Sequence, residues 1–415
     1  MKFSNFTLDT AIKMAVEEMG YKNATAIQQQ TIPLILANND VMARAQTGTG
    51  KTAAFALPLL NNLMAKNHEK EIIRVLVLVP TRELAQQVNK SFNNYGKYCQ
   101  IKSAMVYGGV SIKGQIEQLA CGIDILVATP GRLIDLLTNG HVSLKSIQTL
   151  VLDEADRLLD LGFKKEIEKI FTYLPIKHQT LLFSATFDDA VFKLSKKILH
   201  DPEMISVEDQ NIVATGVEQI IYTVDANKKR ELTSYLIGSK NWQQVLIFTR
   251  TKTSADELAK EMCKDGIKTL ALHGGKSQGA REKCLEEFKQ GRCRVLVATD
   301  VAARGLDIVD LHYVINFELP YVAEDYVHRI GRTARAGKSG QAISLMSPNE
   351  EWLLNAIEEI LECRLLQQWF PGYEPDLTKV IPVKVAGEKQ QARKRSLSKN
   401  NNSQKNRRKT SYKHR

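Results

Sequence analysis

Four carboxylates follow one short apolar run in the sequence. The run TLVL (149–152) leads into Asp153, Glu154 and Asp156, and Asp160 comes four residues later. Acids at the end of a buried strand can hold a divalent cation and polarise a water molecule, as in metal-assisted hydrolysis. The first turn of a helix also favours acids, and we prefer this interpretation for Asp160. The pattern therefore predicts a strand that delivers reactive acids to one point.

A glycine-rich stretch earlier in the chain could bind the phosphates that such a cation neutralises. Residues 41–55 (VMARAQTGTGKTAAF) have the pattern of a strand, a turn and a helix that Lys51 and Thr52 open. Backbone N–H groups and a helix N-terminus bind phosphate oxygens, Lys51 neutralises their charge, and the Thr52 hydroxyl faces Mg²⁺. Ala45 replaces the first glycine of the usual pattern. A chance GKT in an ordinary turn is the alternative, which the flanking strand and helix disfavour.

The two stretches complement each other. A phosphate loop needs a carboxylate at the tip of a neighbouring strand to hold the water shell of magnesium, and Asp153 is placed for this task. Glu154 follows directly and can polarise the attacking water. We therefore predict a Mg²⁺ site at Thr52 and Asp153, held partly through water.

The elements that position these residues are short apolar strands separated by amphipathic helices. Strand-like runs without polar alternation argue for parallel sheets covered on both faces, which is an α/β fold. Beyond 149–152 they are 74–79, 124–130, 180–186, 217–224, 245–250, 294–300 and 313–317. A polar stretch divides them, so the predicted organisation is a first domain at 1–207, a linker at 208–216, a second domain at 217–382 and a tail at 383–415.

The positive charge of the chain lies in its tail. The chain of 415 residues has a net charge of +11, and from Lys384 onward there are 12 Lys or Arg and one acid. The folded part is therefore neutral, and selective nucleic-acid binding must come from placed groups. The tail has almost no large apolar residue, so we expect it to be disordered. Such tails commonly bind polyanions, although a merely solubilising tail is the alternative.

Composition narrows the class of protein. A hydrophobic fraction of 43% and a charged fraction of 25% are those of a soluble globular protein. No apolar stretch approaches the roughly 18 residues that span a bilayer, and the N-terminus lacks a signal-peptide pattern. The six cysteines contain no C-x-x-C pair, so we expect reduced, structural thiols. We predict a cytoplasmic protein with no membrane association.

Three motifs together resemble those of the DEAD-box family of ATP-dependent RNA helicases. They are AQTGTGKT (45–52), DEAD (153–156) and SAT (184–186). The first domain also resembles the family at GYKNATAIQ (20–28), PTRELA (80–85), the pair Gly108 and Gly109, and TPGR (129–132). The second domain resembles it at HGGKSQGAR (273–281), VATDVAARGLD (297–307) and YVHRIGRTARAG (326–337).

The resemblance implies two tandem RecA-like P-loop domains. It covers the chain from Phe3 to about Met346, and the compact domains with a short basic tail are most like the bacterial RhlE-type branch. Ala24 replaces a usual proline, and Ala334 stands where glycine is common. Neither departure removes a side chain that does chemistry.

The resemblance also implies ATP and Mg²⁺ as cofactors. It assigns Phe3 to stacking on adenine and Gln28 to hydrogen-bonding its edge, although a surface glutamine is the alternative for Gln28. The other expected nucleotide-binding residues are Ala45, Gln46, Thr47, Gly48, Thr49, Gly50, Lys51 and Thr52 in the first domain and Asp307 in the second.

Catalysis is expected to be shared between the domains. Lys51, Asp153 and Glu154 lie in the first, and the resemblance makes Arg332 and Arg335 of the second domain fingers that reach the γ-phosphate. It leaves Arg329 structural. The residues expected to couple the nucleotide site to closure are Asp156, Ser184, Thr186 and His328. Closure on ATP would then assemble the site.

RNA is expected to bind across both domains. The resemblance assigns contacts to Arg82, Gly108, Gly109, Thr129 and Arg132 on one side and to Gly274 and Thr299 on the other. Contacts with phosphates and 2′-hydroxyls position a strand without reading its sequence. The implied activity is RNA-stimulated ATP hydrolysis that unwinds short duplexes locally, without processive translocation, or remodels ribonucleoproteins. Ribosome-assembly or RNA-decay complexes are the implied partners.

Two rival functions stay open at this point. A DNA helicase or duplex translocase could use the same scaffold, although the DEAD sequence and the motif around Gln28 argue against it. A non-catalytic RNA clamp is the second rival, and the intact Lys51, Asp153, Glu154, Arg332 and Arg335 argue against that one.

Overall fold

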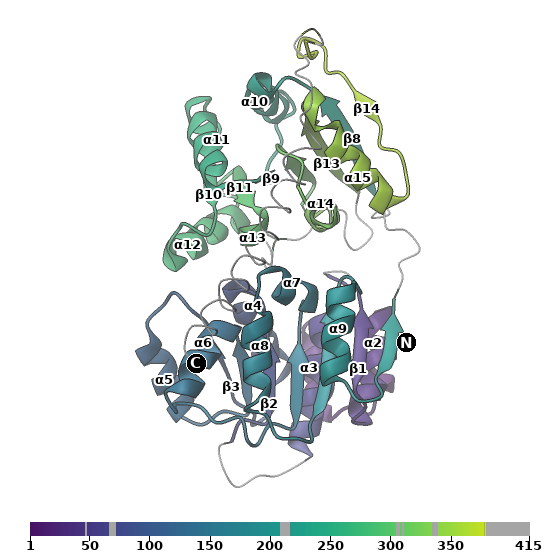
Figure 1. Ribbon diagram of the computed structural model, residues 1–415, viewed down its shortest axis with the longest axis vertical. Helices are drawn as coiled ribbons and strands as arrows, with labels where there is room; N and C mark the ends of the chain where they lie inside the picture. The colour runs from purple at the N-terminus through teal and green to yellow at the C-terminus, as the bar shows by residue number, and fades with distance from the viewer. Residues whose placement is uncertain are drawn as a thin grey trace, which may run out of the picture.

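The chain folds into two α/β domains, one above the other in Figure 1. The computed structural model describes residues 1–45, 48–65, 72–207, 216–303, 308, 311–333, 339–376 and 378. The first domain ends with β7 and the second begins with β8. Most of the predicted linker and the predicted tail lie outside the described residues.

The first sheet contains seven parallel strands within the described residues, in the order β3-β4-β2-β5-β6-β1-β7. Its strands are β1 (Val41–Arg44), β2 (Val75–Leu78), β3 (Ser103–Val106), β4 (Ile125–Ala128), β5 (Thr149–Leu152), β6 (Gln179–Ser184) and β7 (Glu203–Ser206). Since β5 pairs with both β2 and β6, its carboxyl end lies at the centre of the sheet. The acids that follow β5 are thereby placed at the middle of one edge.

Helices cover both faces of this sheet. They are α1 (Thr10–Glu18), α2 (Ala26–Leu36), α3 (Lys51–Met64), α4 (Arg82–Tyr95), α5 (Ile112–Ala120), α6 (Pro130–Thr138), α7 (Ala155–Asp160), α8 (Lys164–Phe171) and α9 (Asp189–Ile198), with a 3-10 turn η1 (Phe3–Asn5). Alternate strand residues face opposite sides: Val151 packs with α2, α3 and α4, whereas Leu150 packs with α6, α8 and α9. The sheet is therefore buried on both faces, as its unbroken apolar strands predict.

The second sheet repeats the topology of the first. Its order of parallel strands in the described residues is β10-β11-β9-β12-β13-β8-β14, which is the first order with each strand number raised by seven. The strands are β8 (Val217–Thr223), β9 (Val245–Thr249), β10 (Thr269–Leu272), β11 (Val295–Thr299), β12 (Tyr313–Asn316), β13 (Gly340–Met346) and β14 (Gln367–Gln368). The prediction of two similar α/β layers with parallel sheets is confirmed.

Helices and short turns cover the second sheet as well. They are η2 (Ala226–Lys228), α10 (Lys229–Ser239), α11 (Lys252–Lys264), α12 (Gln278–Lys289), α13 (Asp300–Ala303), α14 (Ala323–Ile330), η3 (Pro348–Glu350) and α15 (Glu351–Leu361). α10 and α11 share one apolar cluster with the sheet, and α14 and α15 share another.

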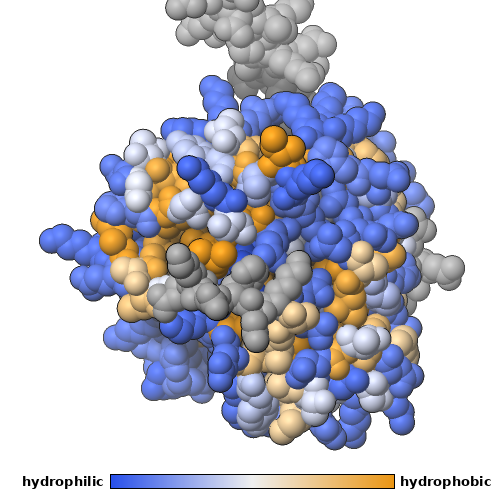
Figure 2. Space-filling model, turned by 90° about the horizontal axis from the view of Figure 1, so that it is seen from below, coloured by the Kyte–Doolittle hydropathy of each residue, from blue (hydrophilic) through white to orange (hydrophobic). Residues whose placement is uncertain are grey.

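The face of the molecule seen from below is mostly hydrophilic, with separate apolar patches (Figure 2). Across the described residues, every helix is too short or too polar to serve as a bilayer-spanning segment.

Candidate active site and nucleic-acid interface

The turn between β1 and α3 needs glycine. Gly48 and Gly50 have φ angles of 91° and 90°, a region that glycine enters without strain. α3 begins at Lys51, as predicted. The Lys51 Nζ is buried and has no hydrogen-bond partner among the described residues. Because a buried ammonium without a partner is costly, this position suits an anionic ligand. Gln46 and Thr47 lie outside the described residues.

The residues beside this turn are held by the sheet. Ala45 is buried, and its N–H donates to the Ser184 carbonyl at 3.0 Å, which joins the end of β1 to the end of β6. Thr49 and Thr52 are half-buried, and Thr52 lies in the first turn of α3. The missing first glycine therefore leaves the strand and helix intact.

Two of the acids after β5 share a buried, strained turn. The Glu154 N–H donates to the Asp153 carboxylate at 3.0 Å, and both side chains are buried. Glu154 has a φ angle of 52°, in the left-handed region that costs a non-glycine residue free energy and that is enriched at functional sites. Burial raises the pKa of the Asp153 carboxyl to about 6, and the nearby Lys51 ammonium opposes this rise. A bound cation would lower the free energy needed to ionise the Asp153 carboxyl.

Asp156 joins the end of β5 to the end of β6. Its carboxylate accepts hydrogen bonds from the backbone N–H groups of Ala185 at 3.0 Å and Thr186 at 3.2 Å. Its own N–H donates to the Ser184 hydroxyl at 3.3 Å. The structure thus brings Asp156, Ser184 and Thr186 together, as the sequence predicts.

The prediction for Asp160 is wrong. α7 starts at Ala155, so Asp160 is the last residue of this short helix and not a member of its first turn. There it approaches Arg157 at 3.4 Å, one turn earlier. The apolar run after the DEAD motif continues as a single short helix, which leaves no room for a new helix start at Asp160.

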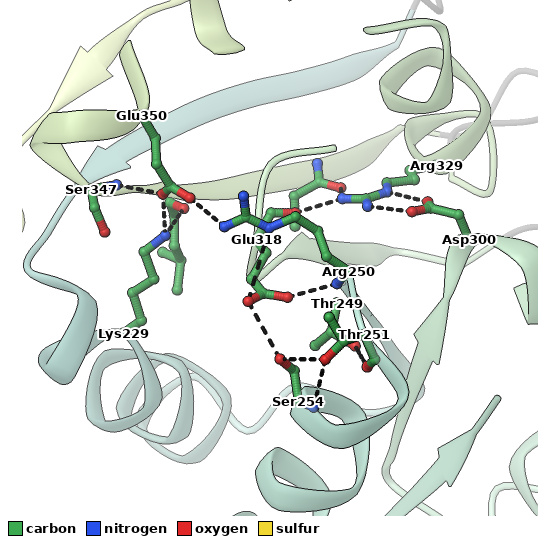
Figure 3. A network of polar contacts seen from close by, with 12 residues as sticks. Lys229, Thr249, Arg250, Thr251, Ser254, Asp300, Glu318, Arg329, Ser347 and Glu350 are labelled. Carbon is green, nitrogen blue, oxygen red and sulfur yellow. Dashed lines mark hydrogen bonds and ion pairs between the residues drawn. The ribbon is translucent and has the colours of Figure 1, made fainter. Parts of the chain in front are cut away.

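The arginines of the second domain separate into different environments. Arg329 on α14 is fully buried and donates to Asp300 at 2.5 and 2.7 Å and to the Glu318 carbonyl at 2.6 Å (Figure 3). These bonds occupy the guanidinium, so Arg329 is structural, as expected. Arg332 follows α14 and is buried, and it lines a small cavity with His328. Arg335 and Asp307 lie outside the described residues.

A second polar network braces the same domain. Lys229 donates to the Glu350 carboxylate at 2.6 Å, and Arg250 binds the other oxygen of that carboxylate (Figure 3). The Arg250 N–H donates to Glu318 at 2.6 Å. Burial lowers the pKa of Lys229; burial would raise that of Glu350, but Lys229 and the Ser347 amide hold it below its usual value. The network links β9, β12, α10 and η3 at one edge of the sheet.

Predicted RNA-binding residues of the first domain lie close together. A methyl group on Gly109 would lie 2.2 Å from the Arg82 guanidinium, so this side chain lies directly against the glycine. Gly109 is exposed and has a φ angle of 82°. Arg132 donates to the Val110 carbonyl at 3.0 Å, one residue further along. Gly108 and Thr129 lie in the same region, since the Thr129 N–H donates to Val106 at the end of β3.

The corresponding residues of the second domain follow β10 and β11. Gly274 is exposed directly after His273, whose Nδ1 accepts the Gly275 N–H at 3.2 Å and whose Nε2 lies 2.9 Å from Asp256. Thr299 is buried at the end of β11. β10 and β11 are neighbours, so these two positions share one edge of the second sheet.

Polar contacts join the two domains within the described part of the chain, and the sequence analysis predicted none of those named here. Arg157 lies 2.9 Å from Asp325, and Glu83 lies 2.7 Å from Arg281. Gln86 also donates to Glu282 at 2.6 Å. For the two ion pairs the sequence signal is opposite charge beside recognised motifs, and charge alone does not identify partners so far apart in the chain.

Comparisons with known proteins agree with this geometry. Residues 25–194 match the DEAD/DEAH box helicase family, and residues 227–337 match the helicase conserved C-terminal domain. The chain is 43% identical to DEAD-box ATP-dependent RNA helicase RhpA of Helicobacter pylori over 84% of its own length and 70% of that protein. The chain belongs to the DEAD-box helicase family. It is also 42% identical to CshA of Bacillus subtilis, over 86% of this helicase and 72% of that one.

Solved structures resemble this DEAD-box helicase over both domains. Saccharomyces cerevisiae Dbp5 bound to RNA and ADP BeF3 matches with a TM-score of 0.78 and 30% identity, over 88% of this chain and 95% of that one. A DEAD box protein from Methanococcus jannaschii has higher identity, 38%, but a TM-score of 0.52 at 89% and 99% coverage. The arrangement of the two domains therefore follows the Dbp5 complex more closely.

The aromatic residues near Gln28 of this DEAD-box helicase have unequal exposure. Phe3 is 5% exposed and packs against Phe6 and Tyr21, whereas Tyr21 is 41% exposed. Gln28 is buried and bridges two backbones: its Oε1 accepts the Thr25 N–H at 2.9 Å, and its Nε2 donates to the Gly50 carbonyl at 3.1 Å. Gln28 is thus in direct contact with the glycine turn before α3, unlike a surface glutamine.

Proposed function

We propose that this protein hydrolyses ATP in response to RNA and uses domain closure to separate short RNA duplexes locally. Membership of the DEAD-box family supports this activity. The observation that carries it is the buried Lys51 ammonium without a partner in the described part of the chain, beside the buried Asp153. A site of this charge suits a phosphate chain with a cation.

The nucleotide phosphates bind the turn between Gly48 and Thr52. Mg²⁺ fits this site, because Thr52 and Asp153 offer the hard oxygen ligands that it prefers while leaving most positions to water and phosphate. When bound, it neutralises phosphate charge. Glu154 accepts a proton from the attacking water.

Adenine stacks on Tyr21. Its exposed ring offers a face to a base, whereas the burial of Phe3 leaves that ring to support Tyr21 from behind. Gln28 hydrogen-bonds the edge of the base. Its bond to the Gly50 carbonyl couples adenine recognition to the phosphate loop.

Closure completes the site from the second domain. Arg332 and Arg335 stabilise charge on the γ-phosphate, and Asp307 contacts the ribose. Asp156 couples the nucleotide site to domain closure through its hydrogen bonds with the backbone of Ala185 and Thr186. His328 on α14 approaches these residues from the second domain.

RNA binds on the surface formed by Arg82, Gly109 and Arg132, and continues to Gly274 and Thr299. Exposed glycines let a sugar–phosphate backbone approach closely, which suits recognition without sequence preference. The Dbp5 complex with RNA and ADP BeF3 supports an RNA path across both domains. The six cysteines are free, which fits a reducing compartment, and we propose the cytoplasm.

Strand displacement tests this function. The full chain should release one strand of a short RNA duplex when ATP and Mg²⁺ are present, and should fail with a long duplex of the same sequence family. Equal displacement of short and long duplexes would indicate a processive translocase. Displacement without ATP hydrolysis would indicate an RNA clamp.

A further inference from the structure

An ion pair joins the helix that carries Asp156 to the helix that carries His328. Arg157 on α7 lies 2.9 Å from Asp325 on α14. Their side chains are only 5% and 9% exposed, and they belong to different domains. In Figure 1, α7 lies on the side of the first domain that faces the second. The pair therefore lies at the junction between the domains.

The same guanidinium has a second partner inside its own domain. Arg157 Nη1 approaches Asp160 at 3.4 Å, with the Asp160 side chain 53% exposed. The Arg157 Nη2 is buried and has no hydrogen-bond partner within the described residues. A buried charge that loses its partner is strongly destabilising. When the domains separate, Arg157 can form bonds with water and with Asp160. When the domains are in contact, Asp325 is the nearer and more buried partner of Arg157.

The position of Asp325 strengthens the pair. Asp325 lies in the first turn of α14, where the helix dipole favours an ionised carboxylate. His328 follows it by three residues on the same helix, and Arg332 comes just after the helix end. A contact that fixes the start of α14 therefore sets the distance of these side chains from Asp156 and the phosphate loop.

We propose that Arg157 and Asp325 are positioning residues that hold α14 against α7 when the domains close. This inference rests on the proposed function, because it gives the pair a part in the RNA-stimulated reaction. Neither residue touches nucleotide or RNA. Their effect acts through the placement of Arg332 and His328.

A double-mutant cycle tests the pair. We expect Arg157→Gln and Asp325→Asn each to lower kcat for ATP hydrolysis at saturating RNA by at least about tenfold. Each substitution leaves the other member of the pair as a buried charge without its partner. The double variant should lose no more than either single variant, because one contact is removed in each case. The affinity for ADP should stay within about twofold of wild type, since ADP binds the first domain. Arg157→Lys should restore part of kcat.

Domain closure is the second readout. Fluorescent labels on the two domains should report a smaller closed fraction for both single variants with RNA and ADP BeF3, although each variant keeps its wild-type melting temperature within a few degrees. Losses that multiply in the double variant would overturn the proposal, and so would a wild-type closed fraction in both single variants.

Two control variants show whether the loss of kcat is specific to the pair of Arg157 and Asp325 or follows from any loss of charge. Asp160→Asn keeps the contact between the domains, so kcat should remain within about twofold of wild type. Lys197→Gln breaks an exposed ion pair with Glu168 in the same domain and should change nothing. A loss with Asp160→Asn as large as with Asp325→Asn would contradict the proposal. If the wild-type chain shows no RNA-stimulated ATP hydrolysis, the proposed function is wrong. If wild type hydrolyses ATP in response to RNA and Asp325→Asn does so at the same rate, only this inference is wrong.

Discussion

The Glu154 N–H donates a hydrogen bond to the Asp153 carboxylate at 3.0 Å, at the point where β5 ends and the backbone enters the left-handed region. In the proposed function, Asp153 helps to hold Mg²⁺ and Glu154 activates the attacking water. Glu154→Gln keeps the size and the backbone but removes the base. We expect RNA-stimulated turnover to fall about 10²- to 10⁴-fold while ATP affinity stays near wild type. Single-turnover hydrolysis and equilibrium ATP binding measure the two effects, and normal hydrolysis by this variant would show that another group is the base.

The raised pKa of Asp153 predicts a pH-dependent gain in stability when its charge is removed. Its folded value of about 6 exceeds the ordinary 3.8, so the folded chain keeps a proton that the unfolded chain releases. Wild type therefore loses stability as the pH rises from about 4 to about 7, and at higher pH the full cost is about 3 kcal/mol. Ligand-free Asp153→Asn should melt at a higher temperature than wild type at pH 7.5, and by less at pH 5.

Exposed Asp189→Asn is the matched control for this experiment, since it removes a carboxylate that water already solvates. Its melting temperature should follow that of wild type at both pH values. An equal gain for Asp153→Asn at pH 5 and pH 7.5 would show that the buried charge is not its cause.

The unequal exposure of Phe3 and Tyr21 predicts different consequences of removing each ring. Tyr21→Ala should weaken ATP binding by about five- to fiftyfold, since a stacked aromatic contributes about 1 to 2 kcal/mol, and should leave the melting temperature nearly unchanged. Phe3→Ala should instead destabilise the first domain by about 3 kcal/mol, because it empties a packed site. Calorimetric titration and thermal unfolding separate them, and a pure binding defect in Phe3→Ala would reverse the assignment.

The contact between Arg82 and Gly109 predicts a defect confined to RNA. A methyl group on Gly109 would collide with the Arg82 guanidinium and would strain a φ angle of 82°. Gly109→Ala should therefore weaken RNA binding by at least about tenfold, since such strain costs of order 1 kcal/mol or more, without changing ATP affinity. Gly114→Ala is the matched control, because a methyl group there meets nothing within 4 Å. Equal RNA affinities for the two variants would exclude this part of the interface.

Local patterns predicted the strands and the acids well. Runs such as 149–152 are buried at every position and almost wholly apolar because the sheet is covered on both faces, so β5 and the acids after it could be predicted from sequence alone. β3, β7, β10, β13 and β14 escaped detection, since the first four mix small or polar residues into their apolar runs and β14 has only two residues. The end of α7 follows a local signal, Gly162, whose φ angle is 85° and whose N–H donates to the Leu159 carbonyl at 2.9 Å.

Relations between distant segments could not be predicted from sequence. The burial of Phe3 results from Tyr21 and Phe6 folding around it, although all three residues are aromatic and equally fit to stack on a base. The pair of Arg157 and Asp325 depends on how two separately folded domains meet. No periodicity within either helix carries that information.

Steady-state ATP hydrolysis by the full chain tests the central claim most directly. It should be measured with single-stranded RNA, with DNA of the same sequence and without nucleic acid, at one salt concentration. We predict at least about tenfold stimulation by RNA and little by DNA, with the RNA-stimulated turnover lost in Glu154→Gln. Equal stimulation by RNA and DNA, or turnover that persists in Glu154→Gln, would contradict an RNA-driven ATPase built on this site.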